Sequence, residues 1–464
     1  MKKVAQHLFL RTLTEIQIPI ILARKLNREG SIIQAGGATI DLQDFREIVA
    51  ISFGKASFPM AEALNDVLAP EFPVEGILVG PEAPPRAFPG WRTFVGGHPL
   101  PTEESFAAGR TILDRLARCG ERSLVFFLIS GGGSAMVEQP LHDGITLEDF
   151  QKLHSALVTC GAPIEEINVI RKHLSATKGG RLAAAAPRAM KITFAISDVP
   201  EGQESALASG PTLPDPSSVQ DAERIVRAYD LLPKLPPSIC TLLERRALSE
   251  TPKPGEPAFA RSHFELLLRT HDLTHACHHA CEGEGFVCLA DNSTDNWTIE
   301  KAADYLLANK LAKQILVVDL DVHQGNGTAK MADENAAIFT FSMHGASNYP
   351  AHKERSDLDI ALPDKTADDL YLKRLKETLP ELIDRVQPDH IFFQSGVDVL
   401  ATDKLGKLSL TREGCKARDH YVLNQCKQNK IPLTISLGGG YSERIIDIVE
   451  AHCNTFRLAQ ELYY

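Results

Sequence analysis

Short apolar runs alternate with amphipathic stretches along most of the 464-residue chain. Up to about residue 253, the apolar runs are IVAISF near 49–54, GILVG at 76–80, SLVFFLIS at 123–130 and KITFAIS at 191–197. The segments between them, such as 103–118, carry apolar residues at helical spacing. Continuous apolar strands separated by helices are typical of a parallel sheet covered by helices. The first half is therefore predicted to be an α/β unit.

A second series of apolar runs begins at Ile315. It contains ILVVDL at 315–320, AIFTFS at 337–342, HIFFQS at 390–395 and PLTISL at 432–437, again with helical segments between them. The Pro-rich stretch ETPKPGEP, Glu250 to Pro257, is predicted to be a linker or a long loop. The length allows two or three domains. The predicted fold class is α/β, with two parallel-sheet units in sequence.

Three predicted strands of the first half end in residues that suit a phosphate ligand. The residues in question are Lys55 after the first strand, Ser130, Gly131, Gly132, Gly133 and Ser134 after the third, and Asp198 after the fourth. Ligands of open α/β sheets gather outside the carboxyl ends of the strands. Successive glycines leave backbone N–H groups open to an anion, a lysine neutralises it, and an aspartate can hold magnesium. A glycine cluster by itself is equally compatible with a tight turn.

The second half places possible metal ligands after the Ile315 run. Residues two apart on a strand share a face, so Asp321 and His323 are expected to project together, as are Asp319 and Asp321 if the strand persists. A catalytic zinc site normally has three protein ligands, and Asp398, after another strand, offers the third. Tyr441 follows three glycines and could donate to an oxyanion. Taken alone, the D-x-H pattern is more often structural, because Asp and His also cap turns.

Charge and cysteine content narrow the class of function. The net charge of −11 argues against nucleic-acid binding and against an anionic membrane surface. No apolar run reaches the roughly 20 residues of a membrane span, and the amino terminus lacks the features of a signal peptide. Nine scattered Cys without a CxxC pair indicate reduced thiols in a cytoplasmic protein. The Cys277, Cys281 and Cys288 cluster near several His could suggest zinc, but its spacing fits a polar helix better.

Several motifs of the first half together resemble one enzyme family. They are ISFGKASFPMAEAL, FVGGHPLPTEESFAAG, LISGGGSAMVEQP, NVIRKHLSATKGGRLA and ISDVPEGQESALASGPTLPDP. They are similar to the amino-terminal, Rossmann-like domain of the type II glycerate 2-kinases, and the resemblance covers about residues 1–308.

That resemblance implies ATP-dependent phosphoryl transfer to glycerate with Mg²⁺. It implies that Lys55 contacts the transferred phosphate, that Ser130–Ser134 form the phosphate loop, and that Asp198 lies at the reaction centre. Lys172, Lys178 and Arg181 are further candidates near the anion. The family's second domain carries glycine-glycine-arginine-asparagine and Thr-Asp-Gly motifs, and neither occurs after residue 308.

Motifs of the second half resemble a different family. VVDLDVHQGNGTA, FTFSMHGASNYPAHKERSDLDIALPD, FFQSGVDVLATDKLGKLSLT and SLGGGYS are similar to the zinc-dependent histone deacetylases, most like bacterial and class IV members, over about residues 310–464. The resemblance implies a partial arginase/deacetylase-like sheet with Zn²⁺ on Asp321, His323 and Asp398. It also implies that Tyr441 polarises the acetyl carbonyl, that Asp319 is a buried charge partner, and that K⁺ sits near Ser342.

The part of a deacetylase that normally precedes the Ile315 strand is replaced by kinase-like sequence. A tandem His usually supplies the general base and acid there, and His278 and His279 are candidates, although a solvated helix face is the simpler interpretation. The domains are predicted as 1–308 and 309–464. With its outer neighbours lost, the Ile315 strand is expected to present an unpaired edge.

Three functional hypotheses follow for the whole chain. The first is a zinc hydrolase acting on an acetylated amine or an acetyl-lysine peptide. The second is a kinase that takes glycerate and ATP, and the third is an inactive fusion that retains zinc or nucleotide binding. All three involve small-molecule partners, and neither nucleic acid nor membrane is expected.

Overall fold

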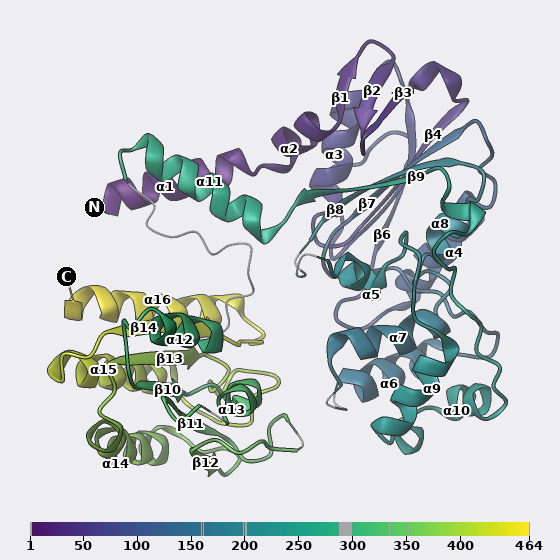
Figure 1. Cartoon of the computed structure of the whole chain (residues 1–464). Coiled ribbons are helices and arrows are strands. Elements are labelled where there is room, and N and C mark those ends of the chain that lie inside the picture. The colour runs from purple at the N-terminus through teal and green to yellow at the C-terminus, as the bar shows by residue number, and fades with distance from the viewer. Residues whose placement is uncertain are drawn as a thin grey trace. The chain divides into compact units, whose positions relative to one another are not determined.

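The computed structural model describes residues 2–158, 160, 162–197, 199, 202–286, 299–333, 335–350 and 352–463. The chain divides into two compact units, Met1–Asn296 and Trp297–Tyr464, each with its own parallel sheet (Figure 1). The predicted α/β class with two parallel-sheet units is confirmed. The predicted boundary at 308/309 concerns where the family resemblance changes, and it stays a prediction.

The first unit is built on a six-stranded parallel sheet with the strand order β6-β5-β4-β7-β8-β9. Its strands are β4 (Glu47–Phe53), β5 (Val74–Gly80), β6 (Trp91–Val95), β7 (Ser123–Ile129), β8 (Met190–Ile196) and β9 (Ser262–Leu268). The predicted apolar runs correspond to β4, β5, β7 and β8. The edge strands β6 and β9 lie outside those runs, because polar residues interrupt their apolar pattern.

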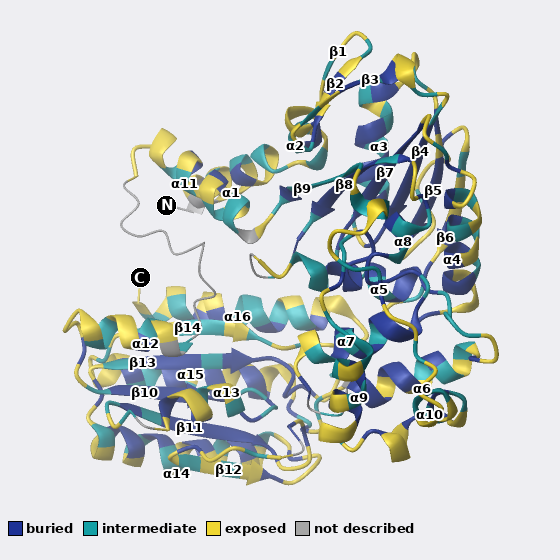
Figure 2. Cartoon of the chain, turned by 45° about the vertical axis from the view of Figure 1, so that its right-hand side comes forward, coloured by how far each residue is buried: buried dark blue, intermediate teal, exposed yellow. Residues whose placement is uncertain are grey.

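Helices cover both faces of this sheet. Ile48 and Ala50 of β4 pack on one face with α2 (Ile18–Lys25) and α3 (Ser57–Leu68). Val49 and Ile51 pack on the other face with α4 (Glu103–Leu116), which matches the predicted helix at 103–118. The central strands are consequently buried on both sides (Figure 2).

Smaller elements complete the first unit. A separate apolar cluster joins α6 (Leu147–Val158), α7 (Ile164–Leu174), α9 (Val219–Ala228) and α10 (Pro237–Glu244). An antiparallel sheet contains β1 (Asn27–Glu29), β2 (Ile32–Ala35) and β3 (Ala38–Asp41). The remaining helices are α1 (Lys2–Glu15), α5 (Gly133–Met136), α8 (Arg181–Ala184) and α11 (Thr270–Gly283). Helices α1 and α11 lie side by side (Figures 1 and 2).

The Pro-rich stretch from Glu250 to Pro257 is a loop of the first unit, not a linker between units. Thr251 is buried and its hydroxyl donates to the Asp215 carboxylate at 3.0 Å. The backbone N–H of Asp215 in turn donates to the Pro252 carbonyl. Of the two predicted possibilities, the structure supports the long loop.

The second unit contains a five-stranded parallel sheet with the order β12-β11-β10-β13-β14. Its strands are β10 (Ile315–Asp319), β11 (Ile338–Gly345), β12 (Leu358–Leu362), β13 (His390–Gly396) and β14 (Leu433–Gly438). One face packs on α14 (Asp368–Val386), α15 (Arg412–Gln428) and α16 (Ile445–Tyr463). The other face packs on α12 (Ile299–Ala308) and α13 (Asn326–Ala332).

The expectation that the Ile315 strand forms an unpaired edge is wrong. Strand β10 lies in the middle of the sheet, hydrogen-bonded to β11 on one side and to β13 on the other. Both neighbours come from later in the chain, so the strand does not depend on the sequence before it for pairing. The edges of the sheet are β12 and β14 instead.

Within the described residues, no helix combines the length and apolar character needed to cross a bilayer.

A buried ion pair in the first unit yields a stability prediction. The Lys178 ammonium lies 2.5 Å from the Glu138 carboxylate, and both side chains are at most 1% exposed. Because Lys178→Met would leave the Glu138 carboxylate buried without its cation, we expect it to lower the free energy of unfolding by about 3–5 kcal/mol. Chemical denaturation measures the change.

The exposed Lys152, paired with Glu148, is the matched control. Lys152→Met should leave the unfolding midpoint unchanged, because water solvates its partner. An unchanged midpoint for Lys178→Met would contradict the assignment.

Candidate functional site

The chain leaves β10 through two successive turns closed by aspartate side chains. Asp319 Oδ1 accepts the backbone N–H of Asp321 at 3.0 Å, and Asp321 Oδ1 accepts that of His323 at 2.9 Å. Strand β10 ends at Asp319, so the expected strand alternation does not extend to His323. These side-chain-to-backbone bonds give the D-x-D-x-H segment its shape instead.

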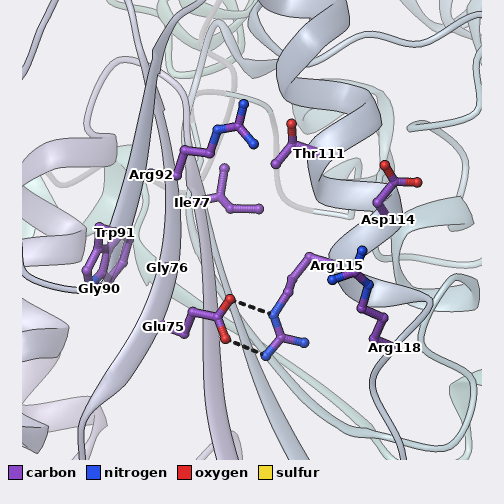
Figure 3. Close-up of a pocket in the computed structure, with 10 residues that line it drawn as sticks. All are labelled: Glu75, Gly76, Ile77, Gly90, Trp91, Arg92, Thr111, Asp114, Arg115 and Arg118. Atoms are coloured by element: carbon purple, nitrogen blue, oxygen red, sulfur yellow. Dashed lines mark hydrogen bonds and ion pairs between the residues drawn. The ribbon is translucent and has the colours of Figure 1, made fainter.

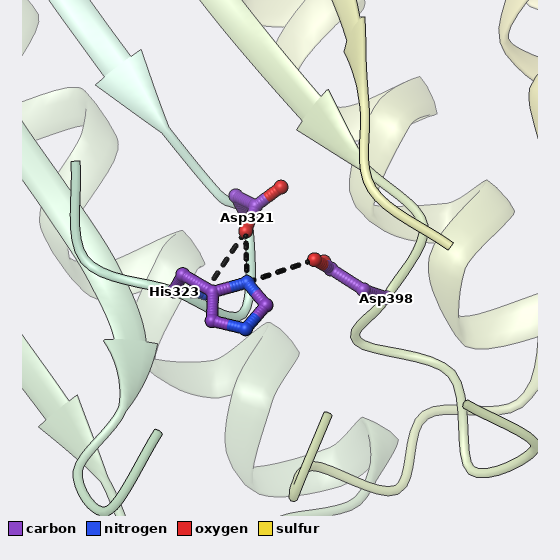
Figure 4. Close-up of side chains that lie close together, drawn as sticks. All are labelled: Asp321, His323 and Asp398. Carbon is purple, nitrogen blue, oxygen red and sulfur yellow. Dashed lines mark hydrogen bonds and ion pairs between the residues drawn. The ribbon is translucent and has the colours of Figure 1, made fainter. Parts of the chain in front are cut away.

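Asp321, His323 and Asp398 converge on one point (Figure 4). His323 Nδ1 lies 3.0 Å from Asp321 Oδ1 and 3.1 Å from Asp398 Oδ2. One possible ligand atom from each residue lies within 4.8 Å of the other two. Asp398 follows β13, the parallel neighbour of β10, and its Oδ1 accepts the Val322 N–H at 3.0 Å. The two loops are therefore joined directly beside the three side chains.

Two glycines let the carboxylates pack against backbone. A Cβ at Gly396 would lie 2.3 Å from Asp321 Oδ2, and one at Gly439 would lie 2.3 Å from Asp398 Oδ2. Gly439 also has φ +64°, a left-handed conformation that favours glycine. Neither glycine is a predicted site residue, although SGVD and GGGY place both of them beside predicted ones.

The three side chains perturb one another strongly. Burial lowers the pKa of His323, but hydrogen bonds and charge from Asp321 and Asp398 outweigh burial and raise it to about 10. Burial raises the pKa of Asp398 to about 6, with the Asp321 charge adding to the shift. Burial and the same Asp321 charge raise the pKa of Asp319 to about 8. A cluster of two carboxylates around one imidazole is a strong candidate for holding a cation.

A cavity of about 370 Å³ opens beside this cluster. Besides Asp319, Asp321 and His323, its lining comprises Ile299, Gln324, Gly325, Gly327, Thr328, Met331 and Gln394. Asp319 is 7% exposed and lies at the wall. A small polar molecule therefore has access to Asp321 and His323 from this side, whereas Asp398 does not line the cavity.

The other predicted residues of the second unit lie outside the cluster of three. Tyr441 is 63% exposed, and its backbone N–H donates to Asp403. Ser342, near which K⁺ is expected, is buried and its Oγ lies 3.0 Å from His344 Nδ1.

His278 and His279 belong to the first unit, on helix α11. His278 Nε2 lies 3.4 Å from Glu282 on the same helix, and His279 Nδ1 lies 3.4 Å from Glu15 on α1. These contacts fit the interpretation of both histidines as part of a polar helix face. Among the described residues, the neighbouring Cys277 and Cys281 join no cluster of possible metal ligands.

The first unit brings Lys55 and the glycine turn together. The N–H of Lys55 donates to the Gly131 carbonyl at 2.9 Å, and Ser130 Oγ accepts the Ala56 N–H at 2.9 Å. Gly132 has φ +84°, and a Cβ there would lie 3.0 Å from the His98 ring and 3.3 Å from Lys55 Cγ. A compact cationic turn thus forms at the carboxyl ends of β4 and β7.

The end of this loop reaches a buried polar group. Helix α5 begins at Gly133, and Ser134 Oγ lies 2.9 Å from Ser209 Oγ. Ser209 Oγ donates to Asn168 Oδ1 at 3.0 Å, while the buried Nδ2 of Asn168 has no partner in the described part of the chain. Asp198 lies outside the described residues.

Two of the three basic residues suggested as additional anion contacts lie in buried ion pairs. Lys172 pairs with Asp215 at 3.2 Å, and Lys178 pairs with Glu138. Arg181 donates to the backbone carbonyls of Ser249 and Glu250. Carboxylates thus neutralise Lys172 and Lys178, whereas the buried Nε of Arg181 has no partner in the described part of the chain; the role of all three near an anion stays a prediction.

A larger cavity, about 450 Å³, lies at the amino-terminal ends of β5 and β6 (Figure 3). Arg115 on its wall forms hydrogen bonds with Glu75 and Glu47. None of the predicted site residues lines it. Its position is opposite to the strand ends where ligands of such sheets bind.

Two family profiles match the chain. The profile described as "Domain of unknown function (DUF4147)" matches residues 4–244, and the profile described as "Histone deacetylase domain" matches residues 272–456. The predicted double resemblance is thereby confirmed. The second match includes His278 and His279.

Relatives match only part of the chain. An uncharacterised protein of Picosynechococcus is 42% identical over 188 residues, which are 40% of this chain and 60% of that protein. Glycerate 2-kinase of Pyrococcus horikoshii is 40% identical over 199 residues, 43% of this chain and 44% of that protein. The chain thus spans less than two thirds of either relative's length.

A solved structure also resembles the chain. Glycerate kinase of Thermotoga maritima superposes with a TM-score of 0.53 at 25% identity, covering 75% of each chain.

The charge cluster predicts how metal affinity varies with pH. In the metal-free protein His323 keeps its proton up to pH about 10, whereas a metal ion needs the free ring nitrogen. Binding near neutral pH must release that proton, so affinity should rise about tenfold per pH unit between roughly pH 7 and 8.5. Competition with a coloured chelator for Zn²⁺ measures this slope.

The stability of the metal-free fold varies with pH in the opposite direction to metal affinity. Because the pKa of His323 is raised from 6.5 to about 10, the contacts of protonated His323 with Asp321 and Asp398 stabilise the fold fully below pH 6.5. This contribution is lost as the pH rises through 10. A metal affinity independent of pH over the stated range would contradict the assignment of His323 as a ligand.

Proposed function

Because the chain belongs to the family described as "Domain of unknown function (DUF4147)" and carries a histone deacetylase domain, we propose that its second unit is a zinc-dependent hydrolase of acetylated amines. The observation that carries the proposal is the convergence of Asp321, His323 and Asp398 within 4.8 Å. Two carboxylates and one imidazole are a suitable donor set for a catalytic zinc site that keeps a position open for water. When bound, zinc lowers the pKa of its water and polarises the substrate carbonyl.

The residues around the ligands have distinct tasks in this proposal. Asp319 holds the Asp321 N–H and so fixes the turn that presents the ligands. The Tyr441 hydroxyl donates a hydrogen bond to the acyl oxygen as negative charge develops there. The cavity lined by Gln324, Thr328 and Gln394 admits the small reactants. The substrate is an acetylated amine such as an acetyl-lysine peptide.

Removing one ligand should abolish both metal binding and turnover. Asp398→Asn is expected to lose stoichiometric zinc and acetate release from an acetyl-lysine peptide, because the remaining pair leaves the site incomplete. Zinc content by atomic absorption and acetate by a coupled assay are the measurements.

Tyr441→Phe is the matched control. It should retain zinc but lower kcat about 10²–10³-fold, since it removes only a transition-state hydrogen bond. Zinc binding without any acetate release from the unaltered chain would favour the inactive-fusion hypothesis instead.

The tandem histidines provide a separate test. Because His278 and His279 contact Glu282 and Glu15 within the first unit, His278→Ala and His279→Ala should leave zinc affinity within about twofold of the unaltered chain. Any acetate release should likewise persist. Loss of acetate release with zinc retained would identify the pair as the general base and acid.

A second candidate function rests on the first unit. The meeting of Lys55 with the Gly131–Gly132 turn and His98 favours a site for a phosphoryl group, with ATP, Mg²⁺ and glycerate as reactants. Burial and the Lys55 charge both lower the pKa of His98, so this imidazole is neutral near pH 7. Lys55 would neutralise phosphate charge while the open N–H groups of the turn hold its oxygens. In this proposal Ser130 begins the phosphate loop, and Gly133 and Ser134 end it.

Lys55→Ala tests this function. We expect ADP release that depends on glycerate to fall at least about 10²-fold, because the phosphoryl oxygens lose their nearest cation. Lys152→Ala, at an exposed lysine that pairs with Glu148, should leave the rate unchanged. A glycerate-dependent signal equal in both variants would eliminate the kinase proposal for Lys55.

A further inference from the structure

A fully buried arginine lies beneath the candidate metal centre. Arg418 of helix α15 is 0% exposed, although a charged side chain is almost never fully buried without a partner. One of its nitrogens, Nη1, donates to two backbone carbonyls: Leu320 at 3.0 Å and Gly396 at 2.7 Å. Leu320 immediately precedes the ligand Asp321, and Gly396 lies two residues before the ligand Asp398.

These two carbonyls lie where the ladder between β10 and β13 ends. The last paired residues are Asp319 and Gln394, and the Leu320 N–H still donates to the Gln394 carbonyl. Beyond that point the chains separate, so their carbonyl groups need another donor. The Nη1 group donates to both chains at once and joins the two strand ends, and the Tyr371 hydroxyl donates to the Leu320 carbonyl as well, at 3.4 Å.

The rest of the guanidinium is held from the opposite side. Nε donates to Asp419 Oδ1 at 2.8 Å, and Nη2 lies 2.8 Å from the same oxygen in an ion pair without forming a hydrogen bond. Asp419 Oδ2 accepts the Thr455 hydroxyl at 2.6 Å. The Asp419 side chain is also 0% exposed. A lysine has a single nitrogen and could not contact Asp419 and the two carbonyls in the same way. Arginine does so because Nε faces Asp419 while Nη1, on the other side of the planar guanidinium, faces the carbonyls.

We propose that Arg418 is a positioning residue for the metal centre, holding the ends of β10 and β13 at the spacing at which Asp321 and Asp398 meet on one ion. A buried ion pair is weak evidence for stability as such, since apolar replacements are often as stable. The contacts of Arg418 lie instead on the two segments that carry the ligands. This inference rests on the proposed zinc site of the second unit.

Cobalt substitution in the full chain separates positioning from folding. The unaltered chain is measured first: failure to bind Zn²⁺ or Co²⁺ refutes the zinc site itself and with it this inference. If it binds, Arg418→Lys should weaken Zn²⁺ affinity about 10–100-fold and change the visible absorption of bound Co²⁺, because the ligand geometry relaxes.

Thr455→Val is the matched control. It disturbs the same buried network beyond Asp419 but leaves both carbonyl bonds of Arg418, so affinity within about twofold and an unaltered cobalt spectrum are expected. Unchanged affinity and spectrum in Arg418→Lys would overturn the inference. Equal losses in both variants would also overturn it, because they would indicate general loosening.

A second variant covers the case in which Arg418→Lys does not fold. The double variant Arg418→Met with Asp419→Leu removes the whole ion pair and should fold, since buried pairs tolerate apolar replacement. Folded protein with weakened Zn²⁺ affinity supports the positioning role. Folded protein with unaltered affinity overturns it, and so does a double variant that also fails to fold, because the role of Arg418 is then structural.

Discussion

The parallel register between β10 and β13 is the constraint on which the candidate metal centre depends. Five residue pairs, from Ile315 with His390 to Asp319 with Gln394, bring both strands to the same edge of the sheet. The ligand-bearing loops therefore leave the sheet at the same level. Close packing then needs Gly396, because any side chain there would collide with the Asp321 carboxylate. Asp321, His323 and Asp398 therefore lie close together mainly because the backbones of β10 and β13 pair in this register.

In the first unit, too, the pairing of two parallel strands brings the residues after their carboxyl ends together, but here they include a basic residue instead of acidic ones. Phe53 of β4 pairs with Ile129 of β7, so Lys55 and Gly131 leave adjacent strand ends and meet. Here the strand ends bring a lysine beside a glycine turn, a combination that suits an anion. In the second unit they present carboxylates and an imidazole, which suit a cation. The sheets share their architecture, and the residues just beyond the strands decide which ligand each can accept.

Sequence patterns predicted the central strands well because these strands are buried on both faces and read as continuous apolar runs. The edge strand β12 escaped prediction, since exposed residues alternate with half-buried or buried apolar ones in the short segment LDIAL. The pairing of β10 was mistaken because sequence order does not specify which strands become neighbours. The proximity of Asp321, His323 and Asp398 was expected from their positions after neighbouring strands and from the family resemblance, although the strand spacing invoked for His323 ends at Asp319. Arg418 was not predicted, because KARDHY resembles the polar face of a surface helix, and only coordinates show that its guanidinium is enclosed.

The five-stranded sheet receives helices on both faces from its own unit, with α12 and α13 on one side and α14, α15 and α16 on the other. The inner strands β10, β11 and β13 are consequently buried between helices of the same unit. Both apolar clusters draw their residues from the second unit alone, so genetic recombination ahead of α12 can attach a different neighbour while these clusters keep their members.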